Sequence, residues 1–566
     1  MQWFGSSRRN WRFAAGWALA GLLAAAAASS QQNPQQPPRP GGPTIRATTR
    51  LVQVSVIVQD SSGAPLPNLK REDFTLLDEG QSQEISVFSV ESAEKITDAP
   101  ALPSDTFSNL IEQRRGTPRS VTVILLDALN TQIEDQAYAR QQVIKFLQQL
   151  QPGDRVALFT LGSRLRMLHD FTQDAASLLR SLDRYRGRTA TGASTPDIPA
   201  PEETGEADLD EWLRDATRRE LNVYAIDRAR RTLRAIEAIA RYLARLPGRK
   251  NLVWVSAGFP IAIGFEDPRS RNYMASELQG FGPDLDRLAR VLSHADLAIY
   301  PVDARGLVGD LSLNIAAPDL DRTAAIRGQP RANPQYSRAE MMWSTQETMR
   351  FLADRTGGRA AYNTNDIRGA IRRALEESRV TYVLGYYPAH DRWDGRFRRI
   401  RVQVRGEESR VRHREGYFAV PDEPPDNRRR QESLLAAAET PLDASELGLT
   451  VFLDRAGDAL KLEQHVEPVG ISLARQQDLW VGQLDFFFYA TDAEGKKVSS
   501  QQQTLNLRIS PSDYATFNAD GLSVAKTLPL PKGALRLRIV VRDTASGRLG
   551  SVTIPFAEPA RQRTSN

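Results

Sequence analysis

The sequence of 566 residues contains no cysteine and only five histidines. Without cysteine there is no disulfide bond, no cysteine-ligated zinc or iron–sulfur cluster and no thiol nucleophile. The histidines form no HExxH pattern, and none stands beside a GxSxG turn. The sequence also lacks a phosphate-binding Walker loop, and no GxGxxG follows a strand pattern. These absences leave oxygen-bearing side chains as the candidate site residues.

The excess of positive charge is small. The formal net charge is +5, and three of those charges belong to Arg8, Arg9 and Arg12 near the N-terminus, which leaves +2 for the remainder. The most basic stretch, residues 227–250, holds eight Lys or Arg against two acidic residues, and it has no regular interleaving of aromatics, since Tyr242 is its one aromatic residue. We interpret it as a solvated helix face, so no nucleic-acid partner is predicted.

The first 30 residues have the pattern of a secretory signal peptide. Three arginines precede the apolar run 13–28, and small residues with an A-x-A spacing follow it. An uncleaved anchor is the alternative, although the run is shorter than the roughly 20 residues that a spanning helix needs. We predict an exported protein (periplasmic, cell-surface or secreted) with no transmembrane segment after cleavage.

The remaining chain is predicted to form several domains. Residues 31–47 are rich in Pro and Gln and indicate a linker. Hydrophobic residues alternate with a period of two in 48–93 and again in 380–420, and neither segment is long enough to close a core alone. We therefore predict that the two segments pair into one β-sandwich with 119–378 inserted between them. Residues 421–445 are predicted to be a second linker and 446–558 a C-terminal β-sandwich.

The central segment, 119–378, alternates apolar strands with amphipathic helices. Residues 121–126 and 252–256 are continuous apolar runs, and 132–150 carries an apolar stripe at helical spacing. This pattern predicts an α/β fold in which a parallel sheet is covered by helices on both faces.

A candidate site follows the first strand of this sheet. Asp127, Asn130 and Thr131 bring a carboxylate, an amide and a hydroxyl to the loop before the helix. Ligands of open parallel sheets bind beyond the carboxyl ends of the strands, and Mg²⁺ prefers oxygen ligands. The same residue types also cap helices, and on the chemistry of the residues alone capping is the favoured interpretation of the loop, because it needs no further assumption.

Several motifs resemble the von Willebrand factor type A domain. They are the strand ending LLDALNT, the segment GDRVALFTLGSRLRMLHDFTQD and the later TGGRAAYNTNDIRGAI. The flanks VQVSVIVQDSSGAPLPNLKREDFTLLDEG, TYVLGYYP, RFRRIRVQVR and REGYF resemble those of predicted secreted proteins common in acidobacteria. The resemblance covers about residues 48–420. It implies a Rossmann-like von Willebrand A domain with a parallel central sheet.

That resemblance also implies a metal-ion-dependent adhesion site, here in degenerate form. Asp127 and Thr131 match two positions of the family's Asp-x-Ser-x-Ser pattern, but Leu129 replaces the first serine. Thr191 is the candidate for the threonine of the second loop, and Ala257 stands where the last aspartate belongs. The expected metal ligands are Asp127, Thr131 and Thr191, with Mg²⁺ as the possible ion. The expected ligand-binding rim consists of Asn130, Ser256 and Asp303.

The sequence thus predicts an exported, non-enzymatic protein with an adhesion-like or scaffold role, which binds a protein ligand. Two alternatives stay open at this point. One is a hydrolase with a metal at Asp127, and the other is a structural envelope component whose metal site is not functional.

Overall fold

The computed structural model describes residues 51–92, 102–110, 121–185, 204–259, 287–307, 346–419 and 426–556, apart from short gaps at 104, 152, 205, 247, 289–290, 293, 347, 378, 391 and 406–408. The predicted signal peptide and linker within residues 1–47, and the candidate ligand Thr191, lie outside the described residues. Of the helices in these ranges, none combines the length and the apolar character that crossing a bilayer requires.

The central part of the chain is an α/β domain built on a five-stranded sheet in the order β10-β9-β6-β7-β8. The strands are β6 (Val121–Asp127), β7 (Val156–Leu161), β8 (Leu165–Thr172), β9 (Lys250–Ser256) and β10 (Leu297–Asp303). The four strands from β10 to β7 pair in parallel, and β8 adds an antiparallel edge. Every residue of the four parallel strands is buried, which explains their unbroken apolar runs. The predicted parallel sheet is confirmed.

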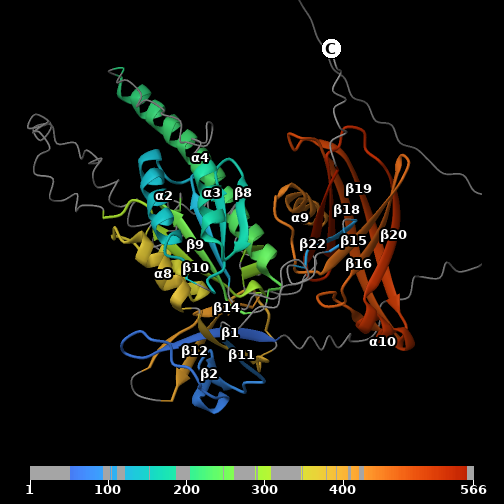
Figure 1. Ribbon diagram of the computed structural model, residues 1–566, viewed down its shortest axis with the longest axis horizontal. Coiled ribbons are helices and arrows are strands. Elements are labelled where there is room, and N and C mark those ends of the chain that lie inside the picture. The colour runs from blue at the N-terminus through green and yellow to red at the C-terminus, as the bar shows by residue number, and fades with distance from the viewer. Residues whose placement is uncertain are drawn as a thin grey trace, which may run out of the picture. The chain divides into compact units, whose positions relative to one another are not determined.

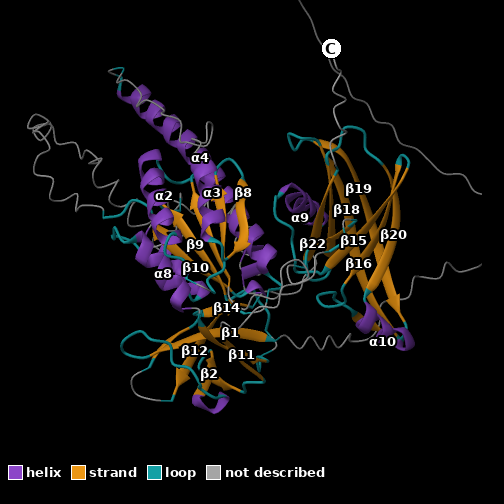
Figure 2. Cartoon of the chain, viewed as in Figure 1, coloured by secondary structure: helices purple, strands orange, loops and turns teal. Residues whose placement is uncertain are grey.

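Helices cover both faces of this sheet (Figures 1 and 2). They are α2 (Ile133–Leu147), α3 (Ala175–Arg184), α4 (Ala207–Leu243) and α8 (Ile367–Glu377). The first, second and fourth share one core with the sheet, in which Val143, Leu178 and Ile371 are fully buried. The opposite face packs on α4 through residues such as Ile236 and Ala240.

The order of the strands places one end of β6 at a topological switch point. From β6 the chain passes through α2 to β7 on one side, and it later returns through α4 to β9 on the other side. The loops after β6 and β9 therefore leave the same edge of the sheet in opposite directions, which is the arrangement that opens a ligand crevice in α/β folds.

Two further sheets form an N-terminal two-sheet unit. Their orders are β13-β1-β11-β4 and β14-β12-β2-β3. The strands are β1 (Val52–Gln59), β2 (Phe74–Asp78), β3 (Gln81–Gln83), β4 (Val87–Ser92), β11 (Val380–Tyr386), β12 (Phe397–Val404), β13 (Arg410–Arg412) and β14 (Gly416–Phe418), with a short helix η1 (Arg71–Asp73) before β2. Val54 pairs with Leu384, and Leu76 with Val402. Strands from before and after the α/β domain thus pair with each other in both sheets, and the two sheets share one core.

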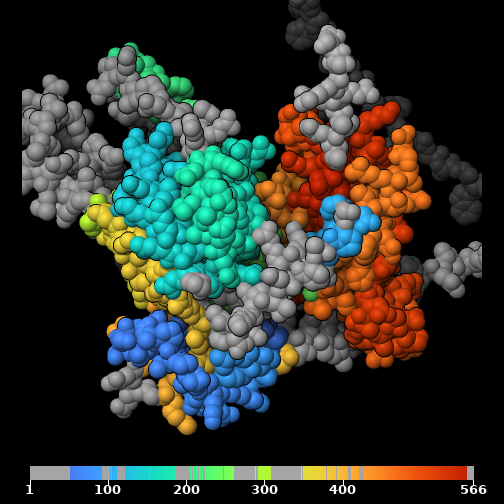
Figure 3. Space-filling view, viewed as in Figure 1, coloured from blue at the N-terminus to red at the C-terminus, as the bar shows by residue number. Residues whose placement is uncertain are grey.

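The C-terminal two-sheet unit takes one of its strands from far upstream. Its sheets have the orders β20-β16-β15-β5 and β17-β18-β21-β22, and β19 also pairs with β18. The strands are β5 (Thr106–Ser108), β15 (Leu449–Ala456), β16 (Ala459–Val466), β17 (Ala474–Gln476), β18 (Leu479–Thr491), β19 (Lys497–Ile509), β20 (Leu522–Pro529), β21 (Arg536–Asp543) and β22 (Leu549–Pro555), and a helix α10 (Pro511–Asp520) follows β19. Figure 3 shows β5 in blue against the orange and red of this unit. The predicted boundaries, 446–558, missed this strand because its three residues carry no recognisable period.

The predicted linker 421–445 is wrong for most of its length, because it contains helix α9 (Asn427–Glu439). Asp426 caps the helix by accepting a hydrogen bond from the backbone of Arg429. Leu434 and Ala437 pack against Val540 of the C-terminal unit. The Pro-rich start and the run of arginines hid an apolar stripe made of one leucine and several alanines.

Asn109, directly after β5, provides a test of the pairing of that strand with the C-terminal unit. Its buried amide donates to the carbonyl oxygens of Ala444 and Leu447, at 2.7 and 2.8 Å, and accepts from the backbone of Leu449 at 2.9 Å. Asn109→Ala is expected to lower the free energy of unfolding of the C-terminal unit by about 3 kcal/mol, since buried partners lose their hydrogen bonds. Hydrogen exchange of β15 and urea denaturation measure this. The exposed Asn506→Ala serves as control, and equal stability of both variants would contradict the assignment.

Candidate functional site

The candidate site centres on Asp127, the last residue of β6, whose side chain turns inward and is only 2% exposed. Five donors surround its carboxylate. The backbone N–H groups of Leu129 and Asn130 donate to Oδ1, both at 3.1 Å. The Asn130 amide, the Trp254 indole and the Ser256 hydroxyl donate to Oδ2 at 2.8, 2.9 and 2.9 Å.

Two of these donors come from β9, the strand beside β6. Trp254 lies in the middle of a buried strand, and a buried indole N–H needs an acceptor that only a neighbouring side chain or backbone can supply. The parallel register pairs Leu125 with Trp254 and thereby brings the indole to the end of β6, where Asp127 accepts its hydrogen bond. Ser256 ends the strand and adds its hydroxyl to the same oxygen.

The loop after β6 is tied to its surroundings by the other two predicted side chains. The Asn130 amide also donates to the hydroxyl of Thr232 on α4 at 2.8 Å. The Thr131 hydroxyl accepts from the backbone of Ala257 at 3.1 Å, which joins the loops after β6 and β9. The predicted convergence of Asp127, Asn130 and Thr131 is thus present, and all three also hold the loop in place.

The electrostatic environment of Asp127 is mixed. Burial raises the pKa of its carboxyl above the ordinary value, and the hydrogen bonds from its neighbours act in the opposite direction. Arg228 of α4 is close enough to interact with this carboxylate, and that attraction partly offsets the lowering of the arginine's pKa by burial. A positive side chain therefore already lies near Asp127.

The residues around Asp127 do not fit a Mg²⁺ ion. A carboxylate offers about four lone-pair positions, and five protein donors already point at those of Asp127. An indole N–H and an amide N–H₂ are not metal ligands, and Leu129 offers no ligand atom. Across the described ranges no group of three or more His, Asp or Glu side chains is placed to hold a metal ion. The predicted ligand set remains untested at Thr191, which is not described.

The prediction of an exposed rim made of Asn130, Ser256 and Asp303 is wrong for two of its members. Ser256 and Asp303 are buried, at 0% and 1% exposed. Ser256 is held by Asp127, and Asp303 forms a two-point ion pair with Arg305 at 2.9 and 2.7 Å. Asn130 is partly exposed, but its amide turns inward. The position of Ser256 and Asp303 at strand ends suggested that they are exposed. Each instead has a partner within the protein, Asp127 or Arg305, that the sequence motif does not indicate.

Sequence reasoning missed Trp254, Thr232 and Arg305 as parts of this site. A signal for Trp254 was available, because a tryptophan inside an apolar strand requires a partner for its N–H. The other two belong to separate elements whose contact depends on the packing of α4 and on the turn after β10, and no local pattern indicates either.

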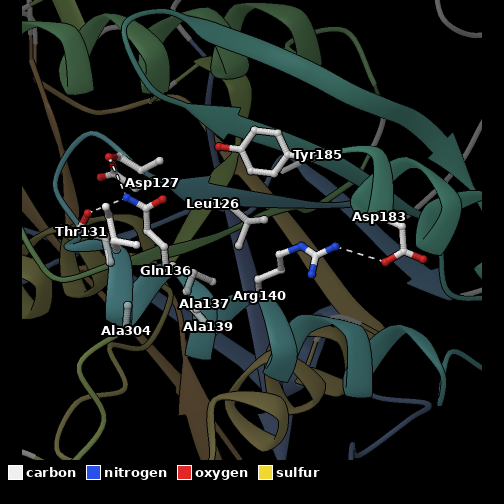
Figure 4. A pocket seen from close by; sticks show the side chains of 13 residues that line it. Leu126, Asp127, Thr131, Gln136, Ala137, Ala139, Arg140, Asp183, Tyr185 and Ala304 are labelled. Carbon is white, nitrogen blue, oxygen red and sulfur yellow. Dashed lines mark hydrogen bonds and ion pairs between the residues drawn. The ribbon is translucent and has the colours of Figure 1, made fainter. Parts of the chain in front are cut away.

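A cavity of about 400 Å³ opens beside Asp127, between α2, the end of α3 and the carboxyl ends of β6 and β9. Its apolar lining consists of Leu126, Ala128, Ile133, Ala137, Ala139, Val255 and Ala304. Its polar lining consists of Asp127, Thr131, Gln136, Arg140, Asp183 and Tyr185. Figure 4 shows Asp127 and Thr131 toward one side of the cavity and the Arg140–Asp183 pair toward the other. The site is therefore an internally bonded aspartate next to a mostly apolar hollow.

Comparisons with known proteins give only distant likenesses. No family model matches the sequence, and no curated protein matches it. The chain is similar to the structure of an aerotolerance-related membrane protein from Bacteroides fragilis, at 13% identity over 46% of this chain and 99% of that chain, with a TM-score of 0.23. It is also similar to the conserved hypothetical protein BatB from Bacteroides thetaiotaomicron, at 12% identity over 46% and 98%, with a TM-score of 0.22.

A third likeness is to the ArnB paralog VWA2 from Sulfolobus acidocaldarius, at 8% identity over 85% of this chain and 74% of that chain, with a TM-score of 0.19. TM-scores this low carry no weight, so the fold class of the chain depends on its own sheet and helices. These define an α/β domain with a parallel central sheet joined to two units of paired β-sheets.

Substitutions at Asp127 test the role of its carboxylate as a common acceptor. Asp127→Ala leaves five donors without it and is expected to lower the free energy of unfolding by about 4 kcal/mol. Asp127→Asn keeps one acceptor oxygen and is expected to have about half that effect. Chemical denaturation measures both, with Asp183→Ala, an exposed carboxylate on α3, as control. Wild-type stability of Asp127→Ala would show that the hydrogen bonds do not hold the loop.

Proposed function

We propose that this chain is an exported, non-enzymatic protein-binding protein whose α/β domain is a von Willebrand A-like domain that works without a metal ion at Asp127. The observation that carries the proposal is the saturation of the Asp127 carboxylate by five protein donors, beside an open cavity at the switch point of the sheet. At the position where the resemblance implies a metal ion, hydrogen bonds from protein donors to Asp127 connect the loops.

Two features support a von Willebrand A-like domain. The three motifs that carry the resemblance fall on β6 and its loop, on β7 and β8, and on the segment leading into α8. Their elements lie in one sheet and one helical layer. Export rests on the signal-peptide pattern, and the two-sheet units are then β-sandwich domains that flank the binding domain.

Hydrolysis at Asp127 is the less supported alternative. A metal-dependent hydrolase needs further carboxylates or histidines facing the ion, and in the described part of the chain no such group surrounds Asp127. An aspartate whose lone pairs are all engaged is also a poor general base, because accepting a proton would compete with its hydrogen bonds. An inert structural role explains the engaged aspartate equally well, but it gives no account of the exposed Ile133 at the edge of the cavity.

Metal addition and removal test the first part of the proposal. We expect no heat of binding when Mg²⁺ or Mn²⁺ is titrated into the mature chain at millimolar concentration, and no change in Tm after EDTA. A ligand that binds only the folded state at 100 times its Kd would stabilise the protein by about 2.7 kcal/mol. A rise in Tm with Mg²⁺ that Asp127→Asn abolishes would overturn the metal-independent proposal.

The binding role is tested by capture with surface variants. The mature chain is immobilised and exposed to envelope extract of its source organism, with and without EDTA. We expect one bound protein whose recovery is unchanged by EDTA and falls about tenfold with Ile133→Asp, because a charge then replaces an exposed apolar contact. Val469→Asp, at another exposed apolar residue, which lies in the C-terminal unit, is the control. Equal recovery with both variants, or turnover of a substrate at the site, would contradict the proposal.

A further inference from the structure

The cavity beside Asp127 has donors that no described group uses. Arg140 lines the cavity with a guanidinium that is partly exposed, and its Nη2 donates to the Leu182 carbonyl at 3.0 Å and to Asp183 at 3.1 Å. Its Nε is fully buried without a hydrogen-bond partner in the described part of the chain, so a ligand would contact the outer nitrogens of the guanidinium. The hydroxyl of Tyr185 accepts from Thr160 at 2.8 Å, which leaves its own proton to donate. Thr131 likewise accepts from a backbone N–H and keeps its proton.

Both carboxylates that line the cavity already have protein donors. Asp127 receives five donors, and Asp183 pairs with Arg140. The amide nitrogen of Gln136 is turned to the carbonyl oxygens of Ala128 and Thr131, at 3.2 and 2.7 Å. A ligand with an amine would therefore find no free carboxylate, whereas a ligand with an anionic oxygen would find donors, one of them on a guanidinium.

The size and the lining of the cavity indicate how large the ligand is and that its uncharged part is apolar. A volume of about 400 Å³ lies at the lower end of the range for small-ligand sites and holds one or two residues of a peptide. Leu126 and Val255 line the cavity together with alanines of α2 and of the loops, so the body of the ligand should be aliphatic. The first residue of α2, Ile133, is 55% exposed at the edge of the cavity and extends this apolar surface outward.

We infer that this cavity binds the C-terminal residue of a partner polypeptide. The aliphatic side chain of that residue lies inside the cavity, and its terminal carboxylate pairs with Arg140. The inference rests on the proposed function, because it names the part of the protein ligand that the α/β domain receives. The Arg140–Asp183 pair does not block this role. Its side chains are 32% and 70% exposed, and an ion pair in such a position contributes little.

The probe is N-acetyl-L-leucine, compared with N-acetyl-L-leucinamide, which lacks the charge. Saturation-transfer NMR with the mature chain is expected to give a Kd on the order of 1 mM for the acid, as for a ligand of about 12 heavy atoms. The amide should bind about tenfold more weakly. Arg140→Met should make the two affinities equal, and Asp183→Asn should strengthen only the acid, several-fold, because a competing carboxylate is removed.

Access to the cavity is tested by Ala137→Trp, since this alanine is exposed on α2 at the cavity. The indole should fill the opening and reduce binding of the acid at least tenfold, whereas Lys145→Trp, two turns further along the exposed side of α2, should leave it unchanged. Equal binding of acid and amide to the wild-type chain, or insensitivity to Ala137→Trp, would overturn the inference.

The two proposals fail separately. Capture that depends on Ile133 while the acid does not bind would remove the cavity inference and leave the protein-binding function. Binding of the acid that depends on Arg140, without any captured protein, would leave the cavity as a carboxylate site and remove the proposed function.

Discussion

The hydrogen bonding of one buried carboxylate organises the functional end of the α/β domain. Asp127 joins its own loop through two backbone N–H groups, and it joins β9 through Trp254 and Ser256. Asn130 extends the same network to α4 through Thr232. A buried charge is tolerated only when its lone pairs are satisfied, so the position of each donor is constrained by the others. The shape of the neighbouring cavity follows from this arrangement, because the loops that border it are fixed by the same network.

If the domain is von Willebrand A-like, as we propose, this network gives a physical reason why it can keep its shape without a metal ion. An ion at the end of the first strand draws together loops from different strands by coordination, and hydrogen bonds to a shared acceptor can do the same. Leu129 and Ala257 stand at positions where the resemblance implies ligands, while an indole and an amide supply donors to Asp127. Under the proposed function, contacts with a partner would come from the residues around Asp127 and not from Asp127 itself.

Secondary structure could be predicted from the sequence where a local pattern reflects burial. The burial of single polar residues could not be predicted where it depends on a partner from a distant segment. The buried runs 121–126 and 252–256 were predictable because parallel strands covered on both faces are largely apolar. The convergence of Asp127, Asn130 and Thr131 followed from their place after a strand. The burial of Ser256 and Asp303 was not predictable, because it depends on partners from β6 and from the turn after β10. Helix α9 was missed because its apolar stripe consists only of Leu434 and two alanines and follows a run of three arginines.

The pairing of β5 with β15 and of β1 with β11 also has a consequence for the order of synthesis. Phe107 pairs with Val451, and Val54 with Leu384, so each early strand leaves the ribosome more than 300 residues before its neighbour. Until then the early strands have unpaired edges, and closing such long loops is slow. The N-terminal two-sheet unit cannot close before β14, which ends at Phe418, and the C-terminal unit cannot close before β22, which ends at Pro555. A product that ends before β11 therefore lacks both two-sheet units, whereas the α/β domain, which is complete with α8, can form ahead of them.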